Sequence, residues 1–181
     1  MTRTPGLYPD VPNTEYHKGL IEVHDVNGLK VKPLSSTGAK TLVRDSPADY
    51  LHQLAHRVEK KAFDMGHAAH ELILEGGLKS VEVLDFDSFR SKAAQAARDA
   101  VYAAGGTPML ERDLADARDM EAAVRSHERA SALISDGQAE VSGLVWDEEY
   151  NIHFQVRFDW LRNDGLIVDL KTSRAGSPQD F

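Results

Sequence analysis

Two carboxylates and a lysine near the end of the sequence have the types and the spacing to do chemistry: Asp159, Asp169 and Lys171. Carboxylates held side by side repel one another, and a divalent cation removes that repulsion. Oxygen ligands favour magnesium or manganese over zinc. A lysine close to the second carboxylate could orient or deprotonate a water, or stabilise the charge that develops on a phosphate. The three residues therefore suit metal-dependent hydrolysis of a phosphodiester bond.

A β-hairpin is predicted to bring these residues together. Residues 152–161 alternate in polarity and residues 165–172 contain a short β-rich run, which is typical of two paired strands. The Asn-Asp-Gly sequence at 163–165 suits a three-residue loop whose glycine takes the left-handed conformation. With that loop Asp159 lies opposite Asp169 and both carboxylates point the same way, whereas a two-residue loop would place them on opposite faces.

Each of these residues also has an interpretation without catalysis. Asp159 could be a polar residue at a strand end, and Asp169 and Lys171 could form a surface ion pair, which stabilises a protein little. The sequence also places three arginines in this region, which could contact phosphates or simply be solvated: Arg157, Arg162 and Arg174.

The first two-thirds of the chain is predicted to be mostly helical. Helix starts are indicated at Ser35-Ser36 and at Ser46-Pro47, because serine caps free amides and proline suits a first turn. Later helices and strands are expected at 62–75, 88–104, 107–110 (extended), 111–134, 139–146, 152–161 and 165–172. The predicted organisation is an irregular N-terminal arm over residues 1–33 and one domain over residues 34–181.

Composition narrows the class of protein. A chain of 181 residues with 41% hydrophobic and 28% charged residues fits one globular domain. The net charge of −8 argues against a broad, nonspecific nucleic-acid surface but not against a local groove. Cysteine is absent, which excludes disulfides, thiolate zinc sites and cysteine-ligated iron–sulfur clusters. Without a long apolar run, a signal peptide or a Walker phosphate loop, we expect a cytoplasmic protein with no membrane contact and no ATP motor of its own.

Several motifs in the same order carry a family resemblance. The block formed by 157–161 (Arg-Phe-Asp-Trp-Leu) and 165–172 (Gly-Leu-Ile-Val-Asp-Leu-Lys-Thr) is the first, and Gly66 to His70 forms a Gly-x-x-x-His helix. An N-terminal motif consists of Leu34-Ser35-Ser36-Thr37, Ser46-Pro47 and Tyr50. Together they resemble the exonuclease VIII family of the PD-(D/E)xK nuclease superfamily, from about Tyr16 to Phe181.

The resemblance implies a fold and an activity. The fold is α/β (α+β), with a central mixed β-sheet flanked by helices, a restriction-endonuclease-like core. The activity is magnesium-dependent (or manganese-dependent) exonuclease digestion of linear double-stranded DNA, 5′ to 3′, in recombination. The resemblance also implies a ring-shaped homo-oligomer, a single-strand annealing protein as partner, and a phage or prophage protein in the cytoplasm of a bacterial host.

The resemblance assigns roles by position. The metal ligands would be His70, Asp159, Asp169 and the carbonyl of Leu170, and Lys171 would be the catalytic lysine. Two assignments have alternatives. His70 could be a core or capping histidine, and both a functional and a structural role remain open for Glu140, which matches an acidic position that binds metal or positions water.

One motif of that family has no counterpart in the sequence. In the family a helix with a Gln-x-x-x-Tyr motif follows the Asp-x-Lys strand, and this sequence ends at Gln179-Asp180-Phe181, where that helix would begin. We therefore expect a core truncated at its C-terminus, whether the protein is naturally short, a fragment, or completed by another chain. The alternative function is a non-catalytic module that binds DNA or a partner without cutting. Retention of Asp159, Asp169 and Lys171 argues against it, because binding alone does not require all three.

Overall fold

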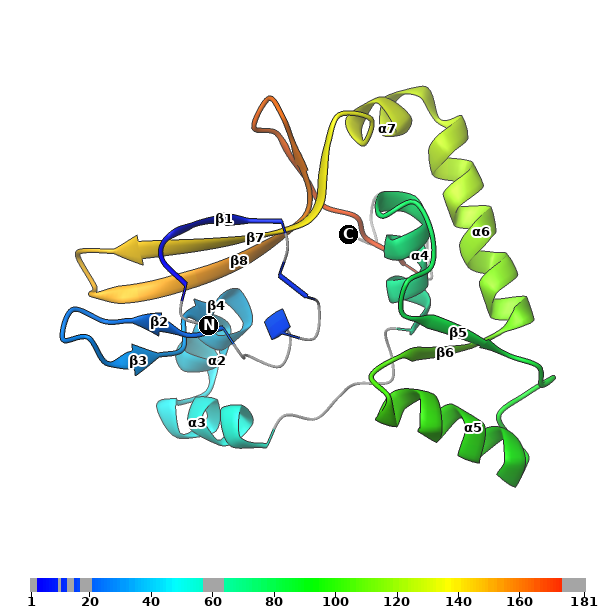
Figure 1. Ribbon diagram of the computed structural model, residues 1–181, viewed down its shortest axis with the longest axis horizontal. Coiled ribbons are helices and arrows are strands. Elements are labelled where there is room, and N and C mark those ends of the chain that lie inside the picture. Colours follow the sequence, from blue (N-terminus) through cyan, green and yellow to red (C-terminus); the bar gives the residue numbers. More distant parts are fainter. Residues whose placement is uncertain (1–2, 10, 13–14, 17–20, 57–63, 174–181) are drawn as a thin grey trace. The chain divides into compact units, whose positions relative to one another are not determined.

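The chain forms two compact units, each built from segments that are far apart in the sequence (Figure 1). The computed structural model describes residues 3–9, 11–12, 15–16, 21–56 and 64–173. Unit 1 comprises Met1–Glu59 and Gln138–Leu161, and unit 2 comprises Lys60–Gly137 and Arg162–Phe181. Among the described helices, none is long and apolar enough to cross a membrane.

A mixed sheet forms the centre of unit 1. Its strands, in spatial order, are β1 (Gly6–Tyr8), β7 (Gly137–Asp147), β8 (Ile152–Arg162) and β4 (Leu34–Ser35). β1 runs antiparallel to β7, while β4 runs parallel to β8, and a short fifth strand, β9 (Ile167–Val168), also pairs with β8. Antiparallel and parallel pairs therefore occur in one sheet, which confirms the predicted α/β class with a central mixed sheet.

One face of this sheet is buried by residues of the N-terminal arm. Leu144 of β7 packs against three apolar residues of the arm, Val11, Ile21 and Val23. On β8, His153 is only 8% exposed, and its Nε2–H donates to the carbonyl of His24 at 2.8 Å. The face of β8 that carries His153 is thus the buried one. The alternation of polar and apolar residues in the sequence does not by itself tell which face is buried.

The arm is less irregular than its composition predicts. Besides β1 it contains β2 (Val23–His24) and β3 (Lys30–Val31), which pair antiparallel. Strands of two or three residues are too short to show a period of two in the sequence. What defines them is their pairing, and pairing depends on tertiary contacts.

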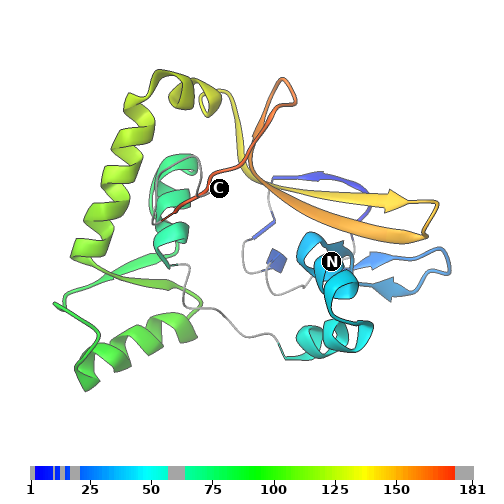
Figure 2. The same cartoon turned by 180° about the vertical axis from the view of Figure 1, so that it is seen from behind.

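Both predicted helix starts in unit 1 are confirmed. α2 (Ser36–Arg44) begins after Ser35, whose side chain accepts from the amide of Gly38, and α3 (Pro47–Ala55) begins after Ser46, which accepts from the amide of Asp49. Figure 2 shows the two helices following β4 in the chain. A serine cap and a proline at the first turn are local signals, so the sequence alone reveals these starts.

Gly38 fills a position in α2 where no larger residue fits. A Cβ atom there would lie 2.8 Å from Cε2 of Tyr50 and 3.0 Å from Cδ1 of Leu34. We expect Gly38→Ala to lower the free energy of unfolding by about 1–2 kcal/mol, because overpacking outweighs the gain of about 1 kcal/mol that alanine normally brings to a helix. Urea denaturation measures the difference.

Gly66 provides the matched control, because it also lies in a helix, α4 (Asp64–Leu74). Among the described residues, a Cβ atom there would meet only Oγ1 of Thr172 within 4 Å, at 3.4 Å. Gly66→Ala is therefore expected to leave stability unchanged or to raise it. Equal stabilisation by both substitutions would contradict the steric argument for Gly38.

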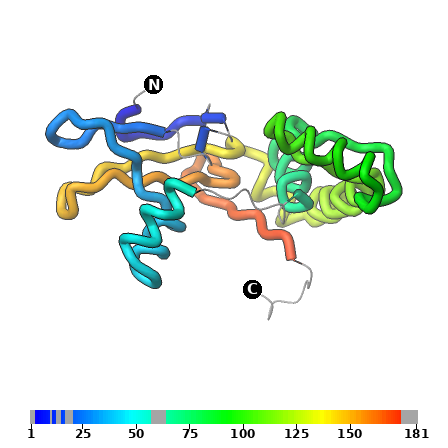
Figure 3. Tube along the Cα trace, turned by 90° about the horizontal axis from the view of Figure 1, so that it is seen from below, coloured from blue at the N-terminus to red at the C-terminus, as the bar shows by residue number. Residues whose placement is uncertain are grey.

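Unit 2 is built around a parallel pair of strands. β5 (Val81–Leu84) pairs with β6 (Thr107–Leu110), and the connection between them contains α5 (Lys92–Ala103). Its core joins α4, β6 and α6 (Glu111–Ser126) through Ala68, Leu72, Met109, Leu114 and Ala117. Figure 3 shows these helices, in teal to yellow-green, gathered together.

In unit 2 one prediction needs correction, and one strand was not predicted. The long helix expected over 111–134 is two helices, because it ends at Ser126 and α7 (Glu128–Leu133) begins after His127. His127 has an extended backbone, and its ring nitrogen accepts from the amide of Ala130, so it caps the second helix. β5 was not predicted, because four residues are too few to show a clear period of two in the sequence.

Candidate functional site

The predicted hairpin loop has the expected length and conformation. The amide of Arg162 donates to the carbonyl of Leu166, and the amide of Gly165 donates back to the carbonyl of Arg162. Three residues therefore form the loop, and Gly165 is left-handed with a φ of 88°. The Arg162 guanidinium beside Asp164 holds the pKa of that carboxyl below its usual range. These contacts confirm the loop on which the predicted register depends.

Asp169 and Lys171 follow the last strand of the hairpin. β9 ends at Val168, and both side chains are largely exposed, at 59% and 60%. Nζ of Lys171 lies 2.5 Å from Oδ2 of Asp169. This is the ion pair of the non-catalytic interpretation, and both side chains are open to solvent. The predicted placement of Asp159 opposite Asp169 stays a prediction.

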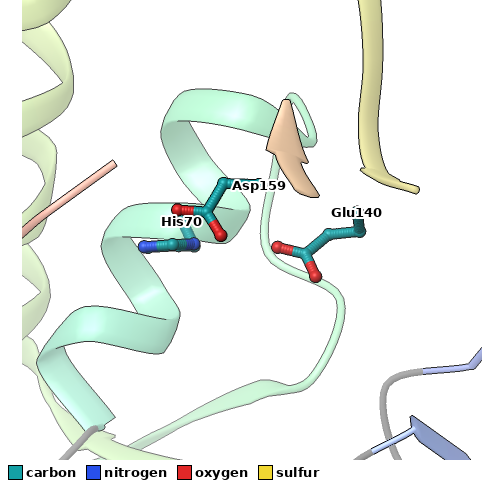
Figure 4. Close-up of side chains that lie close together, drawn as sticks. All are labelled: His70, Glu140 and Asp159. Atoms are coloured by element: carbon teal, nitrogen blue, oxygen red, sulfur yellow. The ribbon is translucent and has the colours of Figure 1, made fainter. Parts of the chain in front are cut away.

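Glu140 and Asp159 are a close pair of carboxylates within unit 1. Glu140 lies on β7 and Asp159 on β8, both are partly buried, and one carboxylate oxygen of Glu140 lies within 4.8 Å of one of Asp159. Figure 4 shows the two carboxyl groups facing each other. The sequence predicted Asp169 as the carboxylate beside Asp159 and left the role of Glu140 open. Within unit 1, the carboxylate beside Asp159 is Glu140.

Glu140 has an unusual backbone for a residue in a strand. Its φ is 56°, in the left-handed region that favours glycine. Such a conformation costs about 1 kcal/mol or more in a non-glycine residue and persists only where surrounding contacts impose it. Within a strand it interrupts the regular alternation and redirects the side chain. Strain of this kind concentrates at functional sites.

Two of the three arginines near the hairpin, Arg157 and Arg162, have different surroundings from those predicted. The Arg157 side chain is only 9% exposed, and its Nε–H donates to the carboxylate of Glu140. Arg162 donates to the carbonyl of Ala132 and to the carboxylate of Asp164. The sequence left open that these two arginines are solvated surface residues, and the structure shows that neither is. Arg174 lies outside the described residues.

His70 lies on α4 in unit 2, half-buried, and Figure 4 shows it on that helix. Its Nε2–H donates to the carbonyl of Leu170 at 3.0 Å, so the neutral ring carries its lone pair on Nδ1. Histidines that bind metals usually donate their other N–H to a carbonyl or carboxylate in this way. His70 is therefore suited to be a ligand. Leu170, predicted as a ligand itself, orients His70 in this structure; whether it also binds a metal stays a prediction.

The donor groups fit the metal that the sequence predicts. Glu140 and Asp159 supply hard oxygen ligands, which Mg²⁺ and Mn²⁺ prefer, and the chain has no cysteine to favour softer metals. Two partly buried carboxylates this close repel one another, and a cation bound between them would relieve that repulsion. The pair can thus hold a divalent cation.

Comparisons with known proteins place the chain in a family. A family model described as a PDDEXK-like domain of unknown function (DUF3799) matches residues 35–181. Comparisons with curated proteins and with solved structures gave no match. The family match confirms the predicted PD-(D/E)xK superfamily and indicates a nuclease-type function.

Proposed function

We propose, because the chain belongs to the family of PDDEXK-like domains DUF3799, that it is a metal-dependent deoxyribonuclease. The observation that carries the proposal is the pair of carboxylates on β7 and β8, Glu140 and Asp159, within 4.8 Å of one another in a protein of this family. Two acidic groups held this close repel one another, and each raises the cost of burying the other. A divalent cation bound between them would relieve that repulsion.

The residues of the chain divide the chemistry among them. Asp159 and Glu140 would hold Mg²⁺ or Mn²⁺, and the motif resemblance names His70 and Asp169 as further ligands. A cation bound there would lower the pKa of a bound water and neutralise charge on the phosphate. Lys171, held beside Asp169 by its ion pair, donates N–H groups to the phosphate oxygen that gains charge.

The finer function is supported by the motif resemblance. We extend the proposal to exonuclease digestion of linear double-stranded DNA, 5′ to 3′, in recombination. A homo-oligomer, a single-strand annealing partner and a phage origin with action in the bacterial cytoplasm belong to the same extension. All of these rest on the similarity of residues 157–172, 66–70 and 34–50 to the exonuclease VIII family.

A second candidate function is a DNA-binding module that does not cut. The exposed ion pair of Asp169 with Lys171 is compatible with it, because a surface ion pair of this kind needs no catalytic role. The two candidates differ in metal dependence. A nuclease needs the cation for turnover, whereas a binding module retains DNA after the metal is removed.

Release of nucleotides from end-labelled linear duplex DNA tests the proposal, with Mg²⁺, with Mn²⁺ and with EDTA. We expect release only with metal, and a decrease of roughly 10²- to 10³-fold in Lys171→Ala. Lys79→Ala is the matched control, because Lys79 is another exposed lysine in a carboxylate ion pair, with Glu75 at 2.7 Å, and it should keep full activity. Closed circular DNA should resist cleavage if the enzyme is an exonuclease.

Two results would contradict the nuclease. One is release that continues in EDTA or is unaffected by Lys171→Ala. The other is DNA binding without release under every metal condition, which favours the binding module. Comparison of the 5′ and the 3′ label decides the direction of digestion.

A further inference from the structure

Arg157 is a buried cation at the centre of a network within unit 1. All three of its guanidinium nitrogens are engaged: Nε donates to Oε2 of Glu140, Nη1 donates to Oγ of Ser142, and Nη1 and Nη2 both donate to the carbonyl of Val11. The guanidinium also lies over the ring of Tyr16, with its carbon 5.1 Å from the ring centre. Its contacts therefore hold it from several directions.

Part of this network comes from the N-terminal arm. Val11 is 3% exposed and accepts two hydrogen bonds from Arg157 through its carbonyl, although the two residues are 146 positions apart in the sequence. Tyr16 covers the flat face of the guanidinium, and burial raises the pKa of its phenol, which therefore stays neutral beside the arginine. The arm thus determines where the guanidinium lies.

Glu140 needs such a partner more than an ordinary glutamate does. Its left-handed backbone has to be imposed by its surroundings, and its carboxylate lies close to that of Asp159. An ion pair to one carboxylate oxygen restricts the rotation of the side chain and offsets the repulsion between the two acids. A fork-shaped guanidinium restrains orientation better than an ammonium group does.

We propose that Arg157 is a positioning residue of the metal site: it holds the Glu140 carboxylate beside Asp159, and the N-terminal arm holds Arg157. The inference rests on the proposed function, since it concerns the same carboxylates. The role proposed for Arg157 is to orient Glu140 and not to bind the phosphate, because its guanidinium donates to Glu140, Ser142 and Val11. Val11 and Tyr16 of the N-terminal arm would thereby contribute to the architecture of the metal site.

A double-mutant cycle on Mn²⁺ binding tests the proposal without relying on activity. Calorimetric titration of Mn²⁺ alone into the full chain compares wild type, Arg157→Gln, Glu140→Gln and the double variant. We expect Arg157→Gln to weaken Mn²⁺ binding about tenfold or more, as substitution of groups that orient metal ligands commonly does. In the Glu140→Gln background the same change should alter the affinity less than about twofold, because Arg157 acts through Glu140.

The sign of the effect separates positioning from simple electrostatics. The positive charge of Arg157 repels a nearby cation, so charge alone would make Arg157→Gln bind Mn²⁺ more tightly. A tighter or unchanged affinity overturns the proposal. A loss of equal size in both backgrounds also overturns it, because Arg157 would then act on the fold or on Asp159.

Folding and the proposed function have separate readouts. If thermal melting shows that Arg157→Gln does not fold, Arg157→Lys replaces it in the cycle. The lysine keeps the charge and one bond to Glu140 but loses the two hydrogen bonds to the carbonyl of Val11. We therefore expect its Mn²⁺ affinity to lie between that of wild type and that expected for Arg157→Gln. Mn²⁺ affinity equal to wild type in Arg157→Lys would overturn the positioning role. A wild-type titration with no Mn²⁺ binding would refute the proposed function, whereas binding without coupling between Arg157 and Glu140 refutes only this inference.

Discussion

Asp159→Asn is expected to lower metal-dependent DNA cleavage by roughly 10³-fold or more while leaving the protein folded. The amide has the shape of the carboxylate but lacks the charge that binds a divalent cation. Asp159 is partly buried and its carboxylate lies within 4.8 Å of a Glu140 oxygen, so the wild-type pair is mutually repulsive without metal. In the metal-free state the substitution should therefore keep or slightly raise stability.

A loss of activity together with retained stability is the signature of a residue kept for function. The measurements are the rate of nucleotide release with Mg²⁺ and the urea denaturation of metal-free protein. Asp147→Asn is the matched control on the same sheet, because Asp147 at the far end of β7 accepts a hydrogen bond from the amide of Tyr150 that asparagine can also accept. Activity retained in Asp159→Asn, or lost equally in Asp147→Asn, would remove Asp159 from the site.

Glu71→Ala is expected to lower the free energy of unfolding by about 3 kcal/mol. Glu71 lies on α4 and is 6% exposed, and its carboxylate accepts from the amide of Lys79 and from both the amide and the hydroxyl of Ser80. Truncation leaves these donors without the acceptor, in a segment that leads into β5. Chemical denaturation measures the loss, and amide hydrogen exchange should show residues 78–84 opening first.

Glu75→Ala is the control for Glu71, because it removes the same residue type one turn later in the chain. Glu75 pairs with the exposed Lys79 at 2.7 Å, and such pairs contribute about 0.5 kcal/mol or less. We expect the unfolding midpoint to move little in this variant. Equal effects of the two substitutions would show that the contacts of Glu71 contribute no more than a surface ion pair.

Local chemistry was readable from the sequence. The serine caps at Ser35 and Ser46 and the left-handed Gly165 were all predicted and confirmed, because each depends on a residue and its immediate neighbours. The mixed sheet and the PD-(D/E)xK superfamily were also predicted, from motifs in a recognisable order. Asp159 could be selected as a candidate on the same basis.

The environment of the buried acidic residues could not be predicted from the sequence. Glu71 lies in an amphipathic helix, where a glutamate is normally solvated, and only the return of residues 79–80 buries it. Similarly, β7 reads as an ordinary strand, and nothing in its sequence indicates that Glu140 is left-handed. Both outcomes depend on segments that meet after folding.

The residue that lies beside Asp159 in unit 1 could not be predicted from the sequence, whereas the loop of the hairpin could. The residue types in the hairpin determined the loop, because turn geometry is a local property, and they predict the register and a hard divalent cation. Tertiary structure decided that Glu140 lies beside Asp159 and that Arg157 holds it. That arrangement requires the carbonyl of Val11, 146 residues away from Arg157, and only the packing of the arm against the sheet brings such distant groups into contact.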